Sequence, residues 1–103
     1  MGVANLDPRS FYSFAKMHQV IIDLREEVDF PINAIPGSLQ LNIKPHEVES
    51  TFGDVDKSMP LYLYCSNGIK SKIIAGILAE NGFDKIYRLR GGFNAWKRSL
   101  KVK

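Results

Sequence analysis

The single cysteine of this 103-residue chain stands where an apolar run ends and a series of turn-forming residues begins. Cys65 follows the run 61–64 and precedes Ser66, Asn67 and Gly68, after which a helical pattern starts. A thiol between a strand end and a helix N-terminus meets unpaired backbone N–H groups and the positive end of the helix dipole. Both favour the thiolate, the reactive form of cysteine. The spacing therefore predicts a nucleophile on an anion-binding loop.

A cysteine in this position can also be a small buried hydrophobic residue that completes a core strand. The residues after it favour the functional interpretation instead. Ser66 and Asn67 are turn formers that expose backbone N–H groups, and Gly68 permits a conformation closed to other residues. Lys70 adds a cation beside them. We therefore expect Cys65 to be catalytic.

Three chemistries use a thiolate on such a loop. A cysteine phosphatase needs an arginine after five intervening residues to hold the phosphate, but position 71 is serine and the loop offers only Lys70. A cysteine–histidine hydrolase needs a base within reach of the thiol, and the candidates His18 and His46 stand in contexts typical of the surface. Sulfur transfer needs neither group. It requires a thiolate, N–H groups that hold a persulfide, and positive potential for an anionic donor.

Strand and helix patterns alternate along the chain and define where this loop lies. The apolar patterns predict strands at 20–24, 39–43, 61–64 and 86–89, and helices at 8–18, at 45–52, after Gly68 as far as Asn81-Gly82, and after Gly91-Gly92. Such alternation predicts an α/β fold of three layers, with a mainly parallel central sheet flanked by helices. Ligands of these sheets bind beyond the carboxyl ends of the strands, so Asp23 and Arg25 are expected near Cys65. We expect Asp23 to have the structural role of an ion pair or turn anchor that shapes the loops, and Arg25 either to share that role or to add to the anion-binding field.

Composition limits the remaining classes of function. With 103 residues and 45% hydrophobic content, the chain fits one packed domain spanning 1–103. One cysteine excludes an intramolecular disulfide, and we expect a cytoplasmic protein with no membrane partner, no cofactor and no metal. The net charge of +3 gathers partly at Lys97, Arg98, Lys101 and Lys103, but no nucleic-acid motif accompanies these residues, so no nucleic-acid partner is expected.

Four separated motifs together carry a family resemblance. They are residues 20–25, which end in Asp23-Leu24-Arg25; Asp29-Phe30 followed by residues 35–38; Tyr64-Cys65 with Gly68 and Ser71; and residues 89–93 with Trp96. In this order and at this spacing they resemble the rhodanese-like sulfurtransferase family. The resemblance covers nearly the whole chain and implies a single rhodanese-like domain. The six-residue loop from Cys65 to Lys70 is similar to the sulfur-handling branch, since phosphatase relatives carry one residue more.

The resemblance implies a thiosulfate sulfurtransferase with a cysteine persulfide intermediate. The thiolate of Cys65 would take a sulfane sulfur from thiosulfate or another persulfide donor and pass it to a thiol or to cyanide. The backbone of the loop would hold the substrate, and Lys70 and Arg25 would attract it. The implied binding residues are Ser66, Asn67, Gly68, Ile69, Lys70 and Arg25.

Two positions differ from many members of the family. This chain has Asn33-Ala34 before Ile35 where many members have Gly-His, and Ser66 where many have arginine. Both differences reduce the fixed charge near the sulfur, so a protein persulfide or a small persulfide is expected among the donors. They also leave open a second class of function, a catalytically weak rhodanese-like module for protein interaction or sulfur relay.

Overall fold

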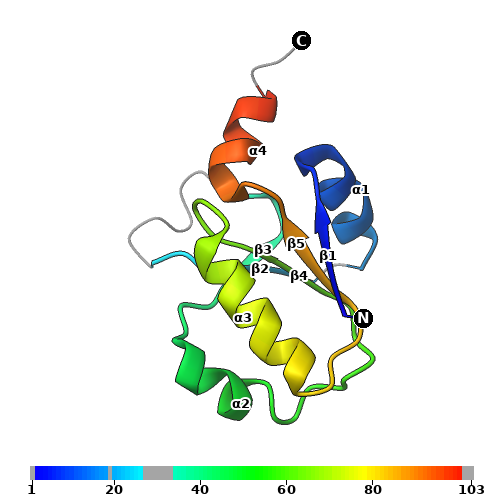
Figure 1. Cartoon of the computed structure of the whole chain (residues 1–103). Coiled ribbons are helices and arrows are strands. Elements are labelled where there is room, and N and C mark those ends of the chain that lie inside the picture. Colours follow the sequence, from blue (N-terminus) through cyan, green and yellow to red (C-terminus); the bar gives the residue numbers. More distant parts are fainter. Residues whose placement is uncertain (1, 19, 27–33, 101–103) are drawn as a thin grey trace.

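The structure, a computed structural model, describes residues 2–18, 20–26 and 34–100, the side chain of His18 excepted. The described elements alternate along the chain, as Figure 1 shows. In order they are β1 (Val3–Leu6), α1 (Pro8–His18), β2 (Ile21–Asp23), β3 (Ser38–Gln40), the 3-10 helix η2 (Pro45–Glu47), α2 (Val48–Thr51), β4 (Leu61–Tyr64), α3 (Ile69–Glu80), β5 (Ile86–Leu89) and α4 (Gly92–Leu100).

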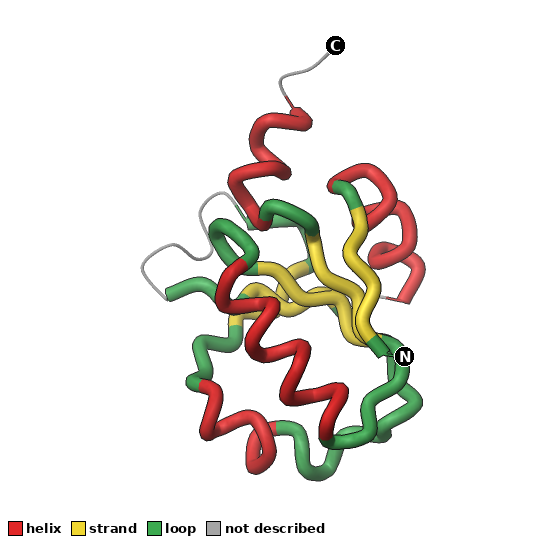
Figure 2. The backbone as a smooth tube through the Cα atoms, viewed as in Figure 1, coloured by secondary structure: helices red, strands yellow, loops and turns green. Residues whose placement is uncertain are grey.

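The five strands form one parallel sheet in the order β1-β5-β4-β2-β3 (Figure 2). Helices cover both faces of it. Side chains of α2 and α3 pack with one face, among them Val48, Ile74 and Leu78. Phe11 of α1 and Phe93 of α4 pack with the other. This arrangement confirms the three-layer α/β fold and its parallel sheet.

Most of the predicted elements are present, with shifted ends. Helix α1 begins as expected, because the N–H of Ser10 donates to Asp7 Oδ1 at 2.8 Å and Pro8 fills the first turn. Helix α3 ends before Asn81, and Gly82 follows with φ +100°. The strands predicted at 20–24 and 39–43 are shorter, and the helix predicted at 45–52 is divided between η2 and α2.

The sequence patterns missed strand β1. It pairs with β5 at the edge of the sheet, with Val3 opposite Ile86 and Leu6 opposite Leu89. Its residues alternate between exposed and half-buried positions, and none is fully buried. A short edge strand of this kind lacks the continuous apolar signal by which buried strands are recognised.

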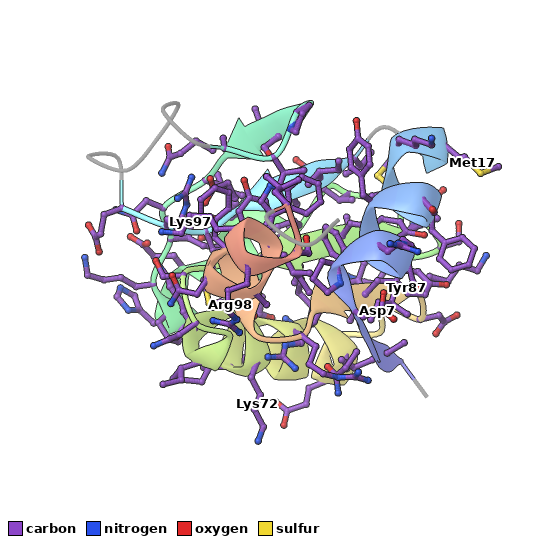
Figure 3. The ribbon with its side chains drawn as sticks, turned by 90° about the horizontal axis from the view of Figure 1, so that it is seen from above. Asp7, Met17, Lys72, Tyr87, Lys97 and Arg98 are labelled. Atoms are coloured by element: carbon purple, nitrogen blue, oxygen red, sulfur yellow. The ribbon has the colours of Figure 1, made fainter. Side chains whose placement is uncertain are left out.

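Sheet topology brings the predicted site residues together at the carboxyl ends of two central strands. Strands β2 and β4 are neighbours, with Asp23 opposite Tyr64. Beyond them the N–H of Leu24 donates to Tyr64 O at 2.8 Å, which extends the pairing toward Arg25 and Cys65. Figure 3 looks down on this edge of the sheet, where the exposed side chains include Lys72, Lys97 and Arg98.

Candidate active site

Two backbone amides point at the sulfur of Cys65. The N–H of Gly68 lies 3.3 Å from Sγ and the N–H of Ser71 lies 3.2 Å from it. Both amides belong to the loop and first turn of α3, where N–H groups lack partners within the helix. The cysteine is 3% exposed and packs with the core, as the alternative interpretation expected. Burial and amide donors occur together here, and the donors suit a sulfur that carries negative charge.

Gly68 shapes the loop. Its φ of +94° lies in the left-handed region, which residues with a side chain rarely adopt, and it precedes the first residue of α3. The side chain of Asn67 then accepts the N–H of Ile69 at 3.0 Å. Of the amides at the start of α3, those of Gly68 and Ser71 thus point at the sulfur and that of Ile69 at the loop's own asparagine. The side chain of Ile69 is 64% exposed.

Helix α4 holds the other side of the loop. The N–H of Phe93 donates to Cys65 O at 2.7 Å, and the N–H of Asn94 donates to Ser66 O at 3.0 Å. This contact requires glycine at position 92, because a Cβ there would lie 2.5 Å from Cys65 O and φ is +66°. The loop carbonyls are therefore turned toward α4. Gly91 and Gly92, both with positive φ, form the bend between β5 and the body of α4.

A small cavity opens at Cys65. It has a volume of about 140 Å³ and is lined by residues 24–26, residues 65–67 and Lys70. The structure thus brings Arg25, Ser66, Asn67 and Lys70 together around the thiol, and their role in substrate binding stays a prediction. Gly68 reaches the sulfur through its amide, and Ile69 does not line the cavity.

Arg25 is engaged by Asp23. The carboxylate is fully buried and accepts from the Nε and NH2 groups of Arg25 at 2.8 to 3.0 Å, and from its backbone N–H at 2.9 Å. The ring of Phe93 lies against the guanidinium, 4.2 Å from its central carbon. Asp23 therefore has the expected structural role. Arg25 forms part of the cavity wall with its charge balanced by this carboxylate.

The hydroxyl of Tyr64 connects this ion pair to a second motif. It donates to Asp23 Oδ2 at 2.9 Å, accepts the N–H of Ile35 at 3.1 Å, and lies 2.9 Å from Ser38 Oγ. Burial raises the pKa of Tyr64 to about 12, with Asp23 adding to the rise and the bonds from Ser38 and Ile35 opposing it. The tyrosine keeps its proton at neutral pH, so it can serve as a donor to the buried carboxylate.

Lys70 is held at the rim of the cavity. Its Nζ donates to Asn42 Oδ1 at 2.8 Å, and the amide of Asn42 donates to Glu26 Oε1 at 3.2 Å. These exposed contacts link the helix start to the segments after β2 and β3. The ammonium group is therefore present beside the thiol but carries a neutral partner of its own.

Sequence reasoning missed Arg88. This residue lies in β5, between β1 and β4, and is only 9% exposed. Its guanidinium donates to Gly68 O at 2.6 Å, to Ser71 Oγ at 3.3 Å and to Asn5 Oδ1. In the sequence, Arg88 has the appearance of an ordinary polar residue in a strand that alternates polar and apolar side chains. Only the strand order, which places β5 inside the sheet, shows that such a charge needs buried partners.

Other predicted features lie outside this site or outside the described residues. His46 is exposed, and the side chain of His18 is not described, as is also true of Asp29, Phe30 and Asn33. Lys101 and Lys103 fall outside the described ranges as well. Among the described residues, no group of three histidine, cysteine or acidic side chains could hold a metal ion. The described helices include none long and apolar enough to span a membrane.

Comparison with known proteins decides the family. The model of the rhodanese-like domain matches residues 7–99. This chain belongs to the rhodanese-like family. Its relatives include the thiosulfate sulfurtransferase GlpE of Shewanella oneidensis, which is 38% identical over 76 residues that make up 74% of this chain and 73% of the relative. The uncharacterized protein YqhL of Bacillus subtilis is 35% identical over 83 residues, 81% of this chain, and this rhodanese-like chain spans 64% of its length.

Solved structures agree with this fold. The rhodanese-related protein of Thermoplasma volcanium has a TM-score of 0.75 at 18% identity, with 92% of this chain and 91% of that chain covered. The reduced CoADR-RHD of Bacillus anthracis has a TM-score of 0.79 at 23% identity and covers 95% of this chain, which matches 17% of the larger protein. The rhodanese-like fold is therefore shown by both sequence and structure.

Proposed function

We propose that this rhodanese-like domain is a sulfurtransferase that carries sulfur as a persulfide on Cys65. The observation that carries the proposal is the pair of amide donors from Gly68 and Ser71 at the sulfur, on the loop that opens into the cavity. Amides in this arrangement stabilise negative charge on the thiolate that must attack the sulfur donor. The likeness to GlpE thiosulfate sulfurtransferases supports the same reaction.

The proposed reaction has two displacements. The thiolate of Cys65 attacks the outer sulfur of thiosulfate; a new S–S bond forms on the cysteine, the S–S bond of thiosulfate breaks, and sulfite leaves with the electron pair. Cyanide or a thiolate acceptor then attacks the outer sulfur of the persulfide. Thiocyanate or a new persulfide is released, and the thiolate of Cys65 is restored. Neither step needs a histidine base, because both nucleophiles react as anions.

The size and charge of the site support small or narrow substrates. A volume of about 140 Å³ is well below the 300–1,000 Å³ of typical drug-sized pockets. In the proposed function the backbone of residues 66–70 holds the anionic donor, Lys70 adds positive potential at the rim, and Arg25, paired with Asp23, forms part of the wall against which the donor binds. The donor is thiosulfate or another persulfide, including a protein persulfide that inserts only its sulfur. A free thiol of this kind fits a reducing compartment, and we place the protein in the cytoplasm.

An intact-mass measurement tests the proposal. Reduced protein is incubated with thiosulfate, and separately with polysulfide, before its mass is taken without reductant. We expect an increase of about 32 daltons, one sulfur on the thiolate, that is lost when cyanide is added and thiocyanate forms. The control is Cys65→Ser, which should show no adduct and no thiocyanate while keeping the fold.

Two outcomes would count against this function. An adduct that forms equally on the serine variant would remove Cys65 as the carrier. Absence of any adduct on the wild-type chain with both donors would favour the alternative of an interaction module. In that case binding of a protein partner would survive Cys65→Ser.

A further inference from the structure

Arg88 lies on the same side of the sheet as Cys65 and beneath the start of α3. Its partner in β4 is Leu63, which packs in the core cluster that also contains Cys65. An added Cβ on Gly68 would lie 3.4 Å from the Arg88 guanidinium. The cation is thus placed against the inner side of the loop, opposite the cavity wall formed by Ser66 and Asn67.

Arg88 contacts the same two residues, Gly68 and Ser71, whose backbone N–H groups point at the sulfur. One NH2 group donates to the carbonyl of Gly68 at 2.6 Å, and Nε donates to the hydroxyl of Ser71 at 3.3 Å. That hydroxyl in turn donates to Gly68 O at 3.3 Å. Gly68 and Ser71 are also the residues whose N–H groups point at Sγ. Arg88 therefore fixes both peptide segments that supply the sulfur's donors.

Among the described residues, Arg88 has no carboxylate partner. Its third contact is the neutral amide oxygen of Asn5, and the one ion pair among the described residues joins Asp23 to Arg25. Burial lowers the pKa of Arg88, and a thiolate at Cys65 opposes that change. Because the attraction between two charges is mutual, the arginine stabilises the thiolate as the thiolate stabilises the arginine.

The other charged groups around the thiol are already balanced or lie at the rim. Arg25 is paired with Asp23, and Lys70 is bonded to Asn42. Glu26 lines the outer part of the cavity, and residues 92–94 at the start of α4 carry no charge. Arg88 is thus a buried cation close to the sulfur whose described partners are all neutral.

We propose that Arg88 is a positioning residue for sulfur transfer, which holds the amides of Gly68 and Ser71 on the sulfur and stabilises the anionic forms of Cys65 from beneath the loop. This inference rests on the proposed function, because the persulfide is one of those anionic forms. Arg88 reaches the substrate only through the loop. Asn5 supports it from β1, so the edge strand contributes to the site.

The first test compares Arg88→Gln with Arg90→Gln. Each change removes one positive charge near the end of β5, but the side chain of Arg90 is exposed and, within the described part of the chain, donates to the backbone oxygen of Asn5 at 3.2 Å. The rate of Cys65 alkylation by iodoacetamide is measured from pH 5 to pH 10. We expect the midpoint of the rate profile to rise by about one pH unit in Arg88→Gln and to stay within about 0.2 units in Arg90→Gln.

The midpoint is a better readout than a single rate. A rise of one unit lowers the thiolate fraction about tenfold at pH values below the midpoint, but a more basic thiolate is also a better nucleophile. The two effects partly cancel, and the rate at pH 6 should fall only about threefold. A profile of Arg88→Gln that superimposes on that of wild type would overturn the proposal.

A second variant retains the arginine in case Arg88→Gln fails to fold. Asn5→Asp is nearly isosteric and gives Arg88 the carboxylate partner that it lacks. We expect the midpoint of alkylation to rise in this variant too, with Arg88 and its loop contacts in place. Asn5→Leu, which removes the contact without adding charge, should raise the midpoint less. An unchanged midpoint in a folded Asn5→Asp variant would contradict the electrostatic part of the proposal.

The alkylation profile separates this proposal from the proposed function. It measures the thiol alone and needs no sulfur donor or acceptor. If wild-type protein forms no persulfide but Arg88→Gln still shifts the profile, the sulfurtransferase assignment fails and the role of Arg88 in thiol reactivity stands. If wild type transfers sulfur and both Arg88→Gln and Asn5→Asp leave the profile unchanged, only the inference about Arg88 fails.

Discussion

Two buried arginines approach the cysteine from opposite faces of the sheet, and their partners differ. Arg25 joins the face covered by α1 and α4, where it is bound by the fully buried carboxylate of Asp23 and lies against Phe93. Arg88 is on the face covered by α3, and its partners are a carbonyl, a hydroxyl and an amide oxygen. One cation is neutralised within the protein, and the other is only hydrogen-bonded.

This difference separates two uses of a buried charge. A buried ion pair is costly to break, because removal of one member leaves the other charge uncompensated, but the intact pair projects little field. A buried arginine with neutral partners pays for desolvation and keeps its charge available to nearby anions. The ion pair of Asp23 and Arg25 should therefore contribute mainly to the stability of the fold. Arg88 should contribute mainly to the reactivity of the thiol.

The largest effect is expected from breaking the ion pair between Asp23 and Arg25. Asp23→Ala leaves the Arg25 guanidinium without its carboxylate and removes an acceptor of the Tyr64 hydroxyl. We expect a loss of about 3–5 kcal/mol in the free energy of unfolding, measured by urea denaturation. Asp84→Ala, at an exposed carboxylate, serves as the control and should stay within about 0.5 kcal/mol of wild type. A loss below about 1 kcal/mol for Asp23→Ala would show that the pair is not the main support of this face.

A smaller, pH-dependent effect on stability is expected from Tyr64, whose hydroxyl donates to Asp23. The pKa of Tyr64 is raised from 10.0 to about 12 in the folded chain, so the unfolded tyrosine loses its proton first and stability falls as the pH rises above about 10. Tyr64→Phe should cost about 1–2 kcal/mol at pH 7, where it removes the hydrogen bond to Asp23. Between pH 9 and pH 11, however, urea midpoints of the variant should decline less steeply than those of wild type. Parallel declines would assign the alkaline loss to other groups.

The smallest effect tests whether reactivity merely follows stability. Gly76 lies on the exposed side of α3, and an added Cβ would have no heavy atom within 4 Å. Gly76→Ala should raise the free energy of unfolding by about 0.5–1 kcal/mol, because alanine favours the helix. The alkylation profile of Cys65 should not move. A shifted profile in this variant would mean that the stability of α3, and not the charge beneath it, sets the reactivity of the thiol.

The sequence predicted the cysteine loop well because its signals are local. A strand pattern, a cysteine, turn formers and a helix pattern follow one another within residues 61–80, and the structure places them as expected. The position of Arg25 beside the cysteine loop was also expected, since the carboxyl ends of parallel strands lie along the same side of a sheet, but Glu26, which lines the cavity as well, was not. Arg25 was expected either in an ion pair or in the field around the donor, and the choice between the two depends on how deeply Asp23 and Arg25 are buried.

The sequence did not reveal the residues that reach the site through contacts between segments far apart in the chain. Asn5 and Arg88 are 83 residues apart and meet only because β1 lies beside β5. Strand β1 itself has a weak pattern because it is an edge, and Arg88 reads as an ordinary polar position of an alternating strand. No local rule distinguishes an arginine that points to solvent from one that points beneath a helix. That distinction requires the order of the strands.

The hydrogen bonds from α4 to the cysteine loop have a consequence for biosynthesis. The carbonyls of Cys65 and Ser66 receive their donors from residues 93 and 94, and Gly92 allows the close approach. A nascent chain that stops short of these residues already contains the thiol but lacks the helix that orients its loop. During synthesis the cysteine therefore emerges well before its environment is complete, and its final reactivity arises only when the closing helix docks.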